Sequence, residues 1–413
     1  MQLYIIWVMD LKKMNATSIQ LLWIITELFP PDETSTAFIL GEIANVMAKK
    51  YEVKVICGPE IYDKRKNTDP NNKFVLNSNI QITHVKGVDL DKNTFFGKAM
   101  RFAVISRQLY QAAKKSIKDG DKVLLVTNPA PVVALVSKLR EKKNFELNIL
   151  VHDVFPENTA PAGLKLPKFA YNILKNIFDK AYCRADQLIA IGRDMKQLLE
   201  QKVGRFEHKP KTIVIENWAD LDIVSPMEQS MNPDKVVLEY AGNIGRVQGL
   251  QSMVEYIKAA GNNELEFHLW GTGAEENSLK EYVQRNGMNN VVFHGAYLRS
   301  KQSEVINICD LALVTLTEGM FGFGVPSKTY NIMAAGKAIL FIGEPNSEIG
   351  LLVKEKNIGY VFEPTDREGI VKFISSLSTE KCAEFKEMGQ CARKVAETEY
   401  AKDIILNKFV EAI

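Results

Sequence analysis

The chain has 413 residues, too many for one ordinary hydrophobic core, which indicates two or three domains with a ligand cleft between them. Apolar residues make up 46% and charged residues 25%, which excludes a disordered tail, a collagen and a multi-span membrane protein. The net charge of +2 hides an asymmetry: up to position 220 there are 33 basic against 24 acidic residues, and beyond it 19 against 26. This predicts one lobe that faces an anion, with phospholipid, lipid-linked phosphate and nucleic acid as candidates and ordinary drift in surface charge as the alternative.

The cysteines and the first residues exclude two further classes. The five cysteines are far apart and form no CxxC pair, so neither a disulfide scaffold nor a zinc ribbon is expected, and a reducing cytoplasm is favoured. The apolar run 3–9 is too short to span a bilayer and lacks a basic flank or a cleavage site. Residues 1–13 are therefore left out of the fold argument.

The first half of the chain alternates short β-branched runs with longer helical patterns, which is typical of a parallel sheet with crossover helices. The predicted strands are Leu21–Ile25, Val53–Cys57, Gln81–Val85, Lys122–Thr127, Leu147–Val151, Gln187–Ala190 and Thr212–Ile215. The predicted helices are Thr36–Lys49, Phe96–Ile117, Val132–Lys142 and Lys168–Cys183.

The same rhythm restarts after a polar stretch, Asn217–Pro233, that we interpret as a hinge. The predicted strands are Val236–Tyr240, Glu266–Trp270, Asn290–Phe293, Leu311–Val314, Ala338–Phe341 and Gly359–Phe362. The predicted helices are Gly249–Ala260, Ala274–Arg285, Ser300–Ile308 and Ser327–Ala335. The fold class is therefore α/β, with two Rossmann-like, doubly wound parallel-sheet lobes facing a central cleft. The expected domains are residues 14–220 and 234–400, followed by a C-terminal helix, 401–413, that packs back toward the first lobe.

Ligands bind at the carboxyl ends of parallel strands, so the residues after each strand carry the chemical information. The strand Val236–Tyr240 runs into a turn with Gly242, Asn243, Gly245 and Arg246 and then into a helix. The glycines let backbone approach a phosphate, the helix offers free N–H groups, and the arginine supplies a bidentate cation. This turn predicts a phosphate site.

A second phosphate-binding element precedes a helix at residues 322–337. The turn and the first helical residues are Gly324, Val325, Pro326, Ser327, Lys328 and Thr329. Proline suits a helix entry and serine a cap, whereas a cation is disfavoured at a helix N-terminus. A bound anion between Lys328 and the helix N-terminus would explain why a lysine occurs at this position. The alternative is that Lys328 is a solvated lysine of the first helical turn. A third turn, Gly271-Thr272-Gly273, either contacts the ligand or is a tight turn with a purely structural role.

Several strings together resemble a known family. Those in the second half are YAGNIGRVQGLQ, LWGTGAEENSL, VVFHGAYLR and GVPSKTYNIMAAGKAIL, and those in the first are ELFPPDETST, HDVFPE, AIGRDMKQLL and VIENWAD. They are similar to the retaining glycosyltransferases of family 4, which have the GT-B fold, and especially to bacterial enzymes of capsule, colanic-acid and O-antigen assembly. The likeness covers about residues 20–400.

The resemblance implies a site and a reaction. Arg246 and Lys328 would neutralise the diphosphate of a nucleotide sugar, with UDP-sugars favoured, and Asn331 would hold the ribose. Backbone around Gly295, Ala296 and Tyr297 would hold the base. The leaving nucleoside diphosphate gains negative charge in the transition state, so fixed cations beside it serve the reaction and no cofactor or metal is expected. Transfer of a hexosyl or N-acetylhexosaminyl group is implied.

The chain departs from the family pattern at two positions. Many relatives carry two glutamates eight positions apart, where this chain has Phe323 and Asn331. Glu318 either replaces the first of them, if its loop folds back, or is an ordinary turn acid.

The acceptor side is predicted from the first half. His152 and Asp153 follow the strand Leu147–Val151, where they would take a proton from an attacking hydroxyl or orient the sugar. The alternative is a histidine bound to a loop beside a turn-forming aspartate. Glu27 and the hydroxyls of Ser35 and Thr36 lie at the same predicted edge, where the two hydroxyl residues replace a glycine pair of many relatives.

The expected partners are a nucleotide-sugar donor, a polyprenyl-diphosphate-linked saccharide and an anionic membrane surface, without nucleic acid. Aromatic and cationic residues alternate over 92–102, as in an interfacial anchor, although a core stripe is the alternative. Four lysines would extend this basic face: Lys165, Lys168, Lys175 and Lys180. We therefore expect a cytoplasmic protein, peripheral on the inner face of the plasma membrane.

Other interpretations fit the sequence less well. The DxD triplets at 89–91 and 220–222 are interpreted as solvated turns, and the scattered histidines form no HExxH or HxH. Serine-hydrolase and P-loop motifs are absent from the sequence. A nucleotide-sugar epimerase of similar architecture and a catalytically silent nucleotide-sugar binding subunit stay open as alternatives.

Overall fold

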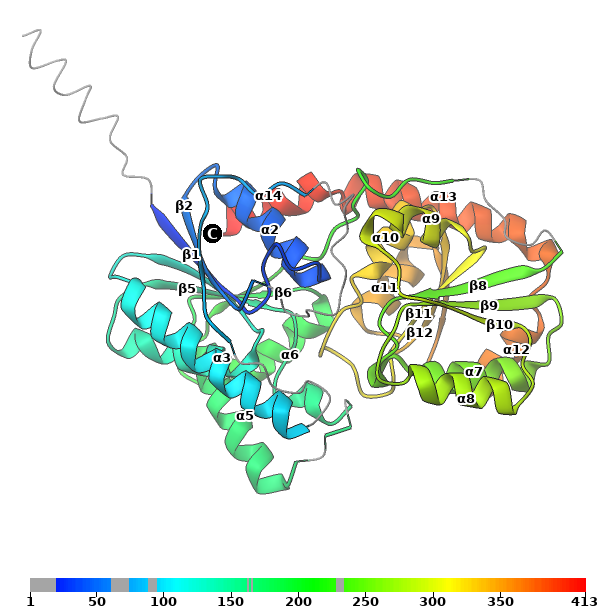
Figure 1. Cartoon of the computed structure of the whole chain (residues 1–413), viewed down its shortest axis with the longest axis horizontal. Helices are drawn as coiled ribbons and strands as arrows, with labels where there is room; N and C mark the ends of the chain where they lie inside the picture. The colour runs from blue at the N-terminus through cyan, green and yellow to red at the C-terminus, as the bar shows by residue number, and fades with distance from the viewer. Residues whose placement is uncertain (1–19, 61–73, 88–94, 162, 165, 228–233) are drawn as a thin grey trace, which may run out of the picture.

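The computed structural model describes residues 20–60, 74–87, 95–161, 163–164, 166–227 and 234–413. Residues 1–13 and the triplet at 89–91 lie outside them, as do residues 92–94 of the predicted anchor at 92–102. The described chain forms two lobes, each built on a parallel sheet between layers of helices (Figure 1). The predicted fold class is confirmed.

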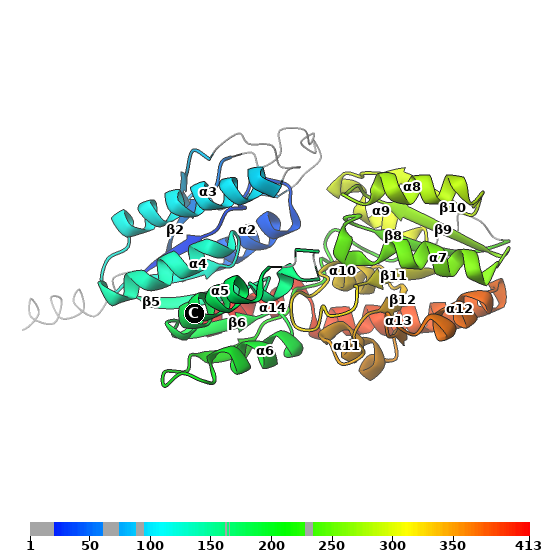
Figure 2. The ribbon, with the colours of Figure 1, turned by 90° about the horizontal axis from the view of Figure 1, so that it is seen from below.

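The N-terminal lobe has a seven-stranded parallel sheet in the order β3-β2-β1-β4-β5-β6-β7. Its strands are β1 (Leu21–Ile25), β2 (Glu52–Cys57), β3 (Gln81–His84), β4 (Lys122–Val126), β5 (Glu146–Val151), β6 (Gln187–Ala190) and β7 (Lys211–Val214). Its helices are α2 (Ser35–Met47), α3 (Phe95–Ser116), α4 (Ala130–Ser137), α5 (Lys168–Cys183) and α6 (Arg193–Val203). The helices α3, α4 and α5 lie side by side in one layer (Figure 2).

The C-terminal lobe has a six-stranded parallel sheet in the order β10-β9-β8-β11-β12-β13. Its strands are β8 (Val236–Ala241), β9 (Leu265–Trp270), β10 (Val291–Gly295), β11 (Leu311–Thr315), β12 (Ala338–Ile342) and β13 (Gly359–Phe362). Its helices are α7 (Leu250–Ala260), α8 (Glu276–Arg285), α9 (Gln302–Asn307), α10 (Lys328–Ala334), α11 (Glu348–Lys356), α12 (Arg367–Ser375) and α13 (Cys382–Glu399).

The central strands form because their residues are apolar on both faces. All five residues of β11 and of β12 are buried, as expected for strands covered by helices on both sides. Every strand that the sequence predicted is present within one or two residues of its expected bounds. The helices α6, α11, α12 and α13 were not placed by the sequence analysis.

The chain crosses between the lobes twice, and the two crossings lie side by side. The Ala219 N–H donates to the Tyr400 carbonyl at 2.7 Å, and Ala219 forms an isolated parallel bridge with Ala401. After the second crossing, α14 (Lys402–Ala412) packs on α2 of the N-terminal lobe (Figure 1). The Tyr51 hydroxyl there donates to the Ile413 carbonyl at 2.7 Å. The lobes are therefore joined by a short double hinge rather than by one linker.

Candidate active site

A cleft of about 430 Å³ opens between the lobes at the carboxyl ends of their strands. Its wall on the N-terminal side contains residues of the α2 start and of the β5 and β6 ends, and its floor contains hinge residues. Its wall on the C-terminal side comes from the ends of β8 and β11 and from the start of α10. The cleft is therefore where the strand-end rule places a ligand.

Thirteen of the predicted site residues line this cleft. They are Ser35, Thr36, His152, Asp153, Gly242, Asn243, Tyr297, Gly324, Val325, Pro326, Ser327, Lys328 and Asn331. Nine others are absent from the lining that the described residues form: Glu27, Arg246, Gly245, Gly271, Gly273, Gly295, Ala296, Glu318 and Thr329.

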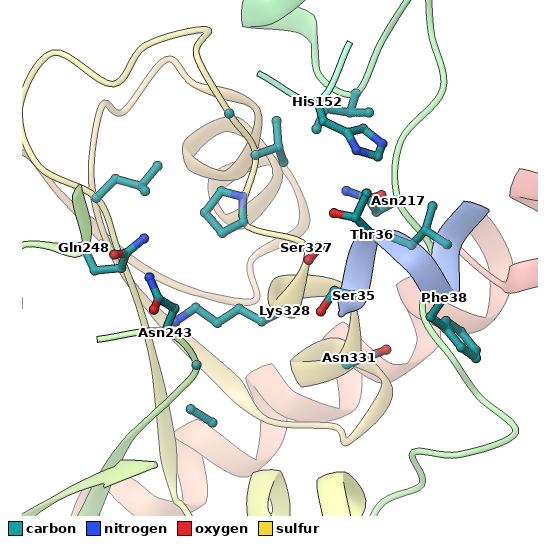
Figure 3. A pocket seen from close by; sticks show the side chains of 18 of the residues that line it. Ser35, Thr36, Phe38, His152, Asn217, Asn243, Gln248, Ser327, Lys328 and Asn331 are labelled. Carbon is teal, nitrogen blue, oxygen red and sulfur yellow. The ribbon is translucent and has the colours of Figure 1, made fainter. Parts of the chain in front are cut away.

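Lys328 extends along the wall of the cleft toward Asn243 (Figure 3). Its Nζ is buried, has no hydrogen-bond partner among the described residues, and lies 3.3 Å from the centre of the Tyr240 ring. Burial lowers the pKa of Lys328 well below its usual value, while Glu239 acts in the opposite direction. A buried ammonium without a hydrogen-bond acceptor is costly to keep. The arrangement is that of a cation prepared for an anionic ligand.

Arg246 lies at the edge of the cleft rather than inside it. It begins the short helix η3 (Arg246–Gln248), whose last two residues line the cleft. Its side chain is 66% exposed and its Nε lies 3.4 Å from the Glu275 carboxylate. A Cβ added to Gly163 of the opposite lobe would lie 3.7 Å from Arg246 Nη1. The guanidinium therefore stands between the lobes, at the mouth of the cleft.

The glycines of the two predicted turns have a packing role. A Cβ at Gly271 would lie 1.8 Å from the Gly242 carbonyl oxygen, and one at Gly273 would lie 2.2 Å from the Ile244 carbonyl oxygen. Backbone hydrogen bonds join the turns, with the Gly242 N–H donating to Trp270 and the Gly271 N–H to Gly295. Since these backbones touch, Gly271 and Gly273 support the wall of the cleft from behind.

The loop before α10 lies against the N-terminal lobe. The Gly322 N–H donates to Asp194 Oδ2 at 3.0 Å, and Phe323 packs against the apolar core. A Cβ at Gly324 would lie 3.8 Å from Asp153 Oδ1. The loop thus brings the start of α10 to the acceptor side of the cleft.

His152 and Asp153 are held at the end of β5 by a neighbouring strand end. Both of their N–H groups donate to Thr127 Oγ1, at 3.0 and 3.3 Å. Burial lowers the pKa of His152 to about 4 and raises that of Asp153 to about 6. The Asp153 side chain keeps contact with solvent at the cleft surface. Near neutral pH, a neutral imidazole and a carboxylate of raised basicity therefore stand together.

The start of α2 points at the opposite wall. Thr34 caps the helix by accepting a hydrogen bond from the Ala37 N–H, and Ser35 and Thr36 then line the cleft (Figure 3). A helix N-terminus with free N–H groups favours an anion. Glu27 has a different role from the one predicted: it is 3% exposed and bonded to Arg101 at 2.8 Å.

Asn331 and Asp220 connect the cleft to the hinge. Asn331 lines the cleft, and its Oδ1 accepts the Asp220 N–H at 3.0 Å. The interpretation of Asp220 as a solvated turn residue was wrong, because its side chain is buried and ion-paired with Arg299 at 3.4 Å. Glu318 is an exposed turn residue outside the cleft lining.

Arg299 is a cleft residue that the sequence reasoning missed. Its guanidinium lies 3.5 Å from the centre of the Phe38 ring, which belongs to α2 of the other lobe. Gln248, Asn217 and Gln302 also line the cleft without having been singled out. Arg299 stands in the quoted string VVFHGAYLR, but no spacing rule separates it from an ordinary surface arginine.

The described residues contain no group of three or more His, Cys, Asp or Glu side chains placed to hold a metal ion. None of the helices in the described part of the chain is long and apolar enough to cross a membrane.

Comparisons with known proteins agree with this architecture. Residues 226–395 match the family described as glycosyl transferases group 1. The chain is 34% identical over 344 residues to a Pseudomonas aeruginosa protein described as probable glycosyltransferase WbjE, covering 78% of this chain and 84% of that protein. It is 27% identical over 214 residues to the Escherichia coli (strain K12) protein assigned to colanic acid biosynthesis as glycosyl transferase WcaI, covering 51% of this chain and 49% of the other.

Solved structures with the same fold are more distant in sequence. Sucrose-phosphate synthase from Thermosynechococcus elongatus has a TM-score of 0.73 at 14% identity and covers 95% of this chain and 98% of its own. Anabaena HepE in complex with UDP has a TM-score of 0.64 at 15% identity and covers 95% of this chain and 99% of its own. Two parallel-sheet lobes with a cleft at their strand ends are the GT-B fold. The chain belongs to the family of glycosyl transferases group 1.

Proposed function

We propose that the chain is a retaining glycosyltransferase of bacterial surface polysaccharide assembly. It moves a sugar from a nucleoside-diphosphate sugar, with a UDP-sugar favoured, to a lipid-linked saccharide. One observation carries the proposal: the ammonium of Lys328 is buried in the interlobe cleft without an acceptor among the described residues. The name of WcaI with colanic acid and the UDP bound to HepE support the substrate class.

The donor's diphosphate fits between two cations of the C-terminal lobe. Lys328 would approach it from the cleft wall, where Gly242 leaves room because a Cβ there would lie 3.5 Å from Lys328 Nζ. Arg246 would leave Glu275 and close over the diphosphate from the mouth of the cleft. Negative charge grows on this group as the sugar departs, so cations fixed beside it lower the barrier. The proposal needs no metal ion and no cofactor.

The acceptor hydroxyl would approach from the N-terminal lobe. Asp153 stands at the end of β5 with a raised pKa, which suits a group that takes a proton from an attacking hydroxyl. His152, kept neutral by its low pKa, would orient the sugar. The N-terminus of α2 adds a favourable dipole for the phosphates from the opposite side. Both lobes therefore contribute to one transfer site.

One face of the N-terminal lobe supports the proposal that the protein docks on a membrane. Phe169, Ile173 and Ile177 on α5 are 71%, 57% and 43% exposed and follow one another at spacings of four residues. Lys168 and Lys180 are exposed on the same helix. Exposed apolar side chains flanked by lysines suit the surface of an anionic bilayer, where a polyprenyl-linked acceptor resides.

Two of the lysines predicted to extend the basic face, Lys175 and Lys165, do not support it. Lys175 is ion-paired with Asp179 at 2.7 Å, so it adds little charge to this face. Lys165 lies outside the described residues. On α3, which lies in the same helix layer (Figure 2), Met100 and Phe102 are 42% and 39% exposed.

A catalytically silent nucleotide-sugar binding subunit is the second candidate. Many relatives carry a glutamate where this chain has Phe323, and the Phe323 ring packs against the apolar core instead of facing the donor. Glu318, the residue considered as a replacement, is exposed to solvent. Both observations favour a subunit that binds the donor without transferring its sugar. The two candidates differ in turnover. UDP-sugars are incubated with a polyprenyl-diphosphate-linked saccharide, and UDP release and the saccharide product are measured. Transfer supports the enzyme, binding without transfer supports the silent subunit, and inversion of the free donor sugar indicates an epimerase.

A matched pair of variants completes that experiment. Lys328→Met should abolish most UDP release, whereas Lys258→Met, which removes an exposed lysine on α7, should retain it. Equal rates in both variants would remove the basis of the proposal.

A further inference from the structure

A motif that the proposed function leaves unused lies at the end of β6. The string AIGRDMKQLL places Gly192, Arg193 and Asp194 where that strand turns into α6. The Arg193 backbone N–H donates to Glu348 Oε2 at 2.7 Å, and its guanidinium donates to both oxygens of the same carboxylate, at 3.0 and 3.2 Å. Its Nη1 donates to both oxygens of Glu355, at 2.9 and 3.0 Å. Glu348 and Glu355 belong to α11, so Arg193 binds two acids of the opposite lobe.

Glu348 depends on this contact because it is buried. Its side chain is 2% exposed, against 42% for Arg193, and among the described residues the hydrogen bonds that its carboxylate accepts come from Arg193. An exposed ion pair contributes little, whereas a buried carboxylate bound at both oxygens by a guanidinium is strong and geometrically specific. Without the guanidinium, Glu348 would be a buried charge that lacks a partner. The N-terminal lobe therefore supplies the counter-ion of a buried group in the C-terminal lobe.

Asp194 makes a second contact across the same interface. It is 3% exposed, and its Oδ2 accepts the Gly322 N–H at 3.0 Å. A Cβ at Gly322 would lie 3.0 Å from the Asp194 carbonyl oxygen, and one at Gly192 would lie 2.9 Å from Val325 Cγ2. The start of α6 and the loop before α10 therefore approach each other closely. We call the residues that bond across this interface the interlobe clasp: Arg193, Asp194, Gly322, Glu348 and Glu355.

The interlobe clasp holds a loop that leads into the site. Residues 324–327 follow Gly322 in this loop and line the cleft, and Lys328 begins α10 directly after them. Helix α10 is held separately, because it packs on α13, β11 and β12 of its own lobe. Loss of the clasp would therefore leave Lys328 on its helix, but would release the loop and the second lobe from each other.

We propose that Arg193 and Asp194 are positioning residues, which hold the loop 322–326 and α11 against the N-terminal lobe so that a donor beside Lys328 faces Asp153. This inference rests on the proposed function, because it assigns the donor to Lys328 and the acceptor base to Asp153. Neither Arg193 nor Asp194 lines the cleft. They act on the reaction through the distance between groups of the two lobes, and a misplacement of about 1 Å can cost about 100-fold in rate.

The proposal predicts a split between donor binding and turnover. The cations assigned to UDP belong to the C-terminal lobe, so UDP affinity should stay within about twofold of the wild type when the interlobe clasp is broken. Transfer needs groups of both lobes, so kcat should fall about 10- to 100-fold. A residue that only supports the fold would instead lower Tm and UDP affinity together.

The test compares three substitutions on α6. Asp194→Ala removes the acceptor for the Gly322 N–H, Asp194→Asn keeps an amide oxygen in its place, and Glu200→Ala removes an exposed carboxylate of the same helix as a control. The measurements are kcat with a UDP-sugar and a lipid-linked saccharide, UDP affinity by calorimetry, and amide hydrogen exchange of a peptide covering 318–327. We expect Asp194→Ala to lower kcat at least about tenfold, to bind UDP as the wild type does, and to exchange faster in that peptide. Asp194→Asn should recover most of the lost kcat, and Glu200→Ala should match the wild type.

Arg193→Met provides a second route if Asp194→Ala does not fold, with Lys196→Met as its control on the same helix. It should lower kcat and leave UDP affinity unchanged. A wild-type kcat in either clasp variant, or a parallel fall in Tm and UDP affinity, would overturn the proposal. If the wild type transfers no sugar from any UDP-sugar, the proposed function fails, and hydrogen exchange still decides on the contact. Unchanged exchange of the 318–327 peptide in Asp194→Ala would overturn the positioning role, and faster exchange would support it.

Discussion

Replacing Lys328 by methionine separates its role in the reaction from its role in the fold. The lysine is buried without a hydrogen-bond acceptor among the described residues, so its contact with the Tyr240 ring offsets only part of the cost of burying its charge. An apolar side chain of similar volume in place of a buried ion is often neutral or stabilising by about 1–4 kcal/mol. Removing one fixed donor at a charge-developing oxygen costs about 2–4 kcal/mol of transition-state stabilisation. Lys328→Met should therefore keep or raise Tm and lose activity.

The expected loss corresponds to a decrease of about 30- to 1,000-fold in kcat/KM, at about 1.4 kcal/mol per tenfold. The measurement is UDP release with a UDP-sugar and a lipid-linked saccharide, beside thermal unfolding of the same preparation. Activity within threefold of the wild type would refute the reasoning. A fall in Tm of several degrees together with the lost activity would show that Lys328 supports the fold instead.

Three further predictions concern the base, the cleft wall and the membrane face. Asp153→Asn should lower kcat by about 10²- to 10⁴-fold. Because the pKa of Asp153 is raised to about 6, wild-type kcat/KM should fall as pH decreases through that value, and the variant should lack this fall. Gly271→Ala should lower Tm, because its φ of +125° is strained for alanine and its Cβ would lie 1.8 Å from a backbone carbonyl oxygen; the strain alone costs about 1–3 kcal/mol. Phe169→Ser with Ile173→Ser should weaken binding to phosphatidylglycerol vesicles at least about tenfold, as two apolar side chains are withdrawn from the bilayer.

The last two of these predictions have matched controls. Gly261→Ala introduces a Cβ that would meet nothing within 4 Å, so it should lower Tm less than Gly271→Ala does. Val75→Ser changes a side chain that is 78% exposed outside the α5 face and should leave vesicle binding unchanged. An equal loss of Tm at the two glycines, or an equal loss of vesicle binding in the two serine variants, would contradict the assignments.

The strands were predictable because they are covered on both faces. Uninterrupted apolar runs such as Leu311–Thr315 and Ala338–Ile342 have few alternative structures in a chain of this composition. Some helices carried signals that the sequence analysis did not use. Ser347 and Asp366 cap α11 and α12 by accepting hydrogen bonds from the Gly350 and Gly369 N–H groups, three residues further on.

The site was predictable where it depends on strand ends and turns, and less so where it depends on how the lobes meet. Asp153 reaches the cleft because it follows the end of β5, and Lys328 reaches it because it begins α10. The conformation of Arg246 depends on Glu275, a side chain 29 positions away that no local pattern relates to it. Arg299 reaches Phe38 across the interface between the lobes, so its role depends on lobe packing that single-sequence periodicity does not encode.

The turns that contain Gly242 and Gly271 show the same limit of prediction from sequence. A strand, a GxG and a helix are the pattern of a phosphate site, and the first turn does line the cleft at Gly242. In the second turn the same residue type is required because two backbones touch, as the Gly271 and Gly242 contact shows. The pattern predicts close approach, and only the fold decides whether a ligand or another turn approaches.

The most direct test of the account is an experimental structure of the chain with UDP. We predict that the diphosphate lies in the interlobe cleft, within hydrogen-bond distance of Lys328 Nζ, and that the Arg246 guanidinium leaves Glu275 and bonds to the same phosphates. A diphosphate bound elsewhere, or one that leaves Lys328 without contact while Arg246 stays on Glu275, would contradict it.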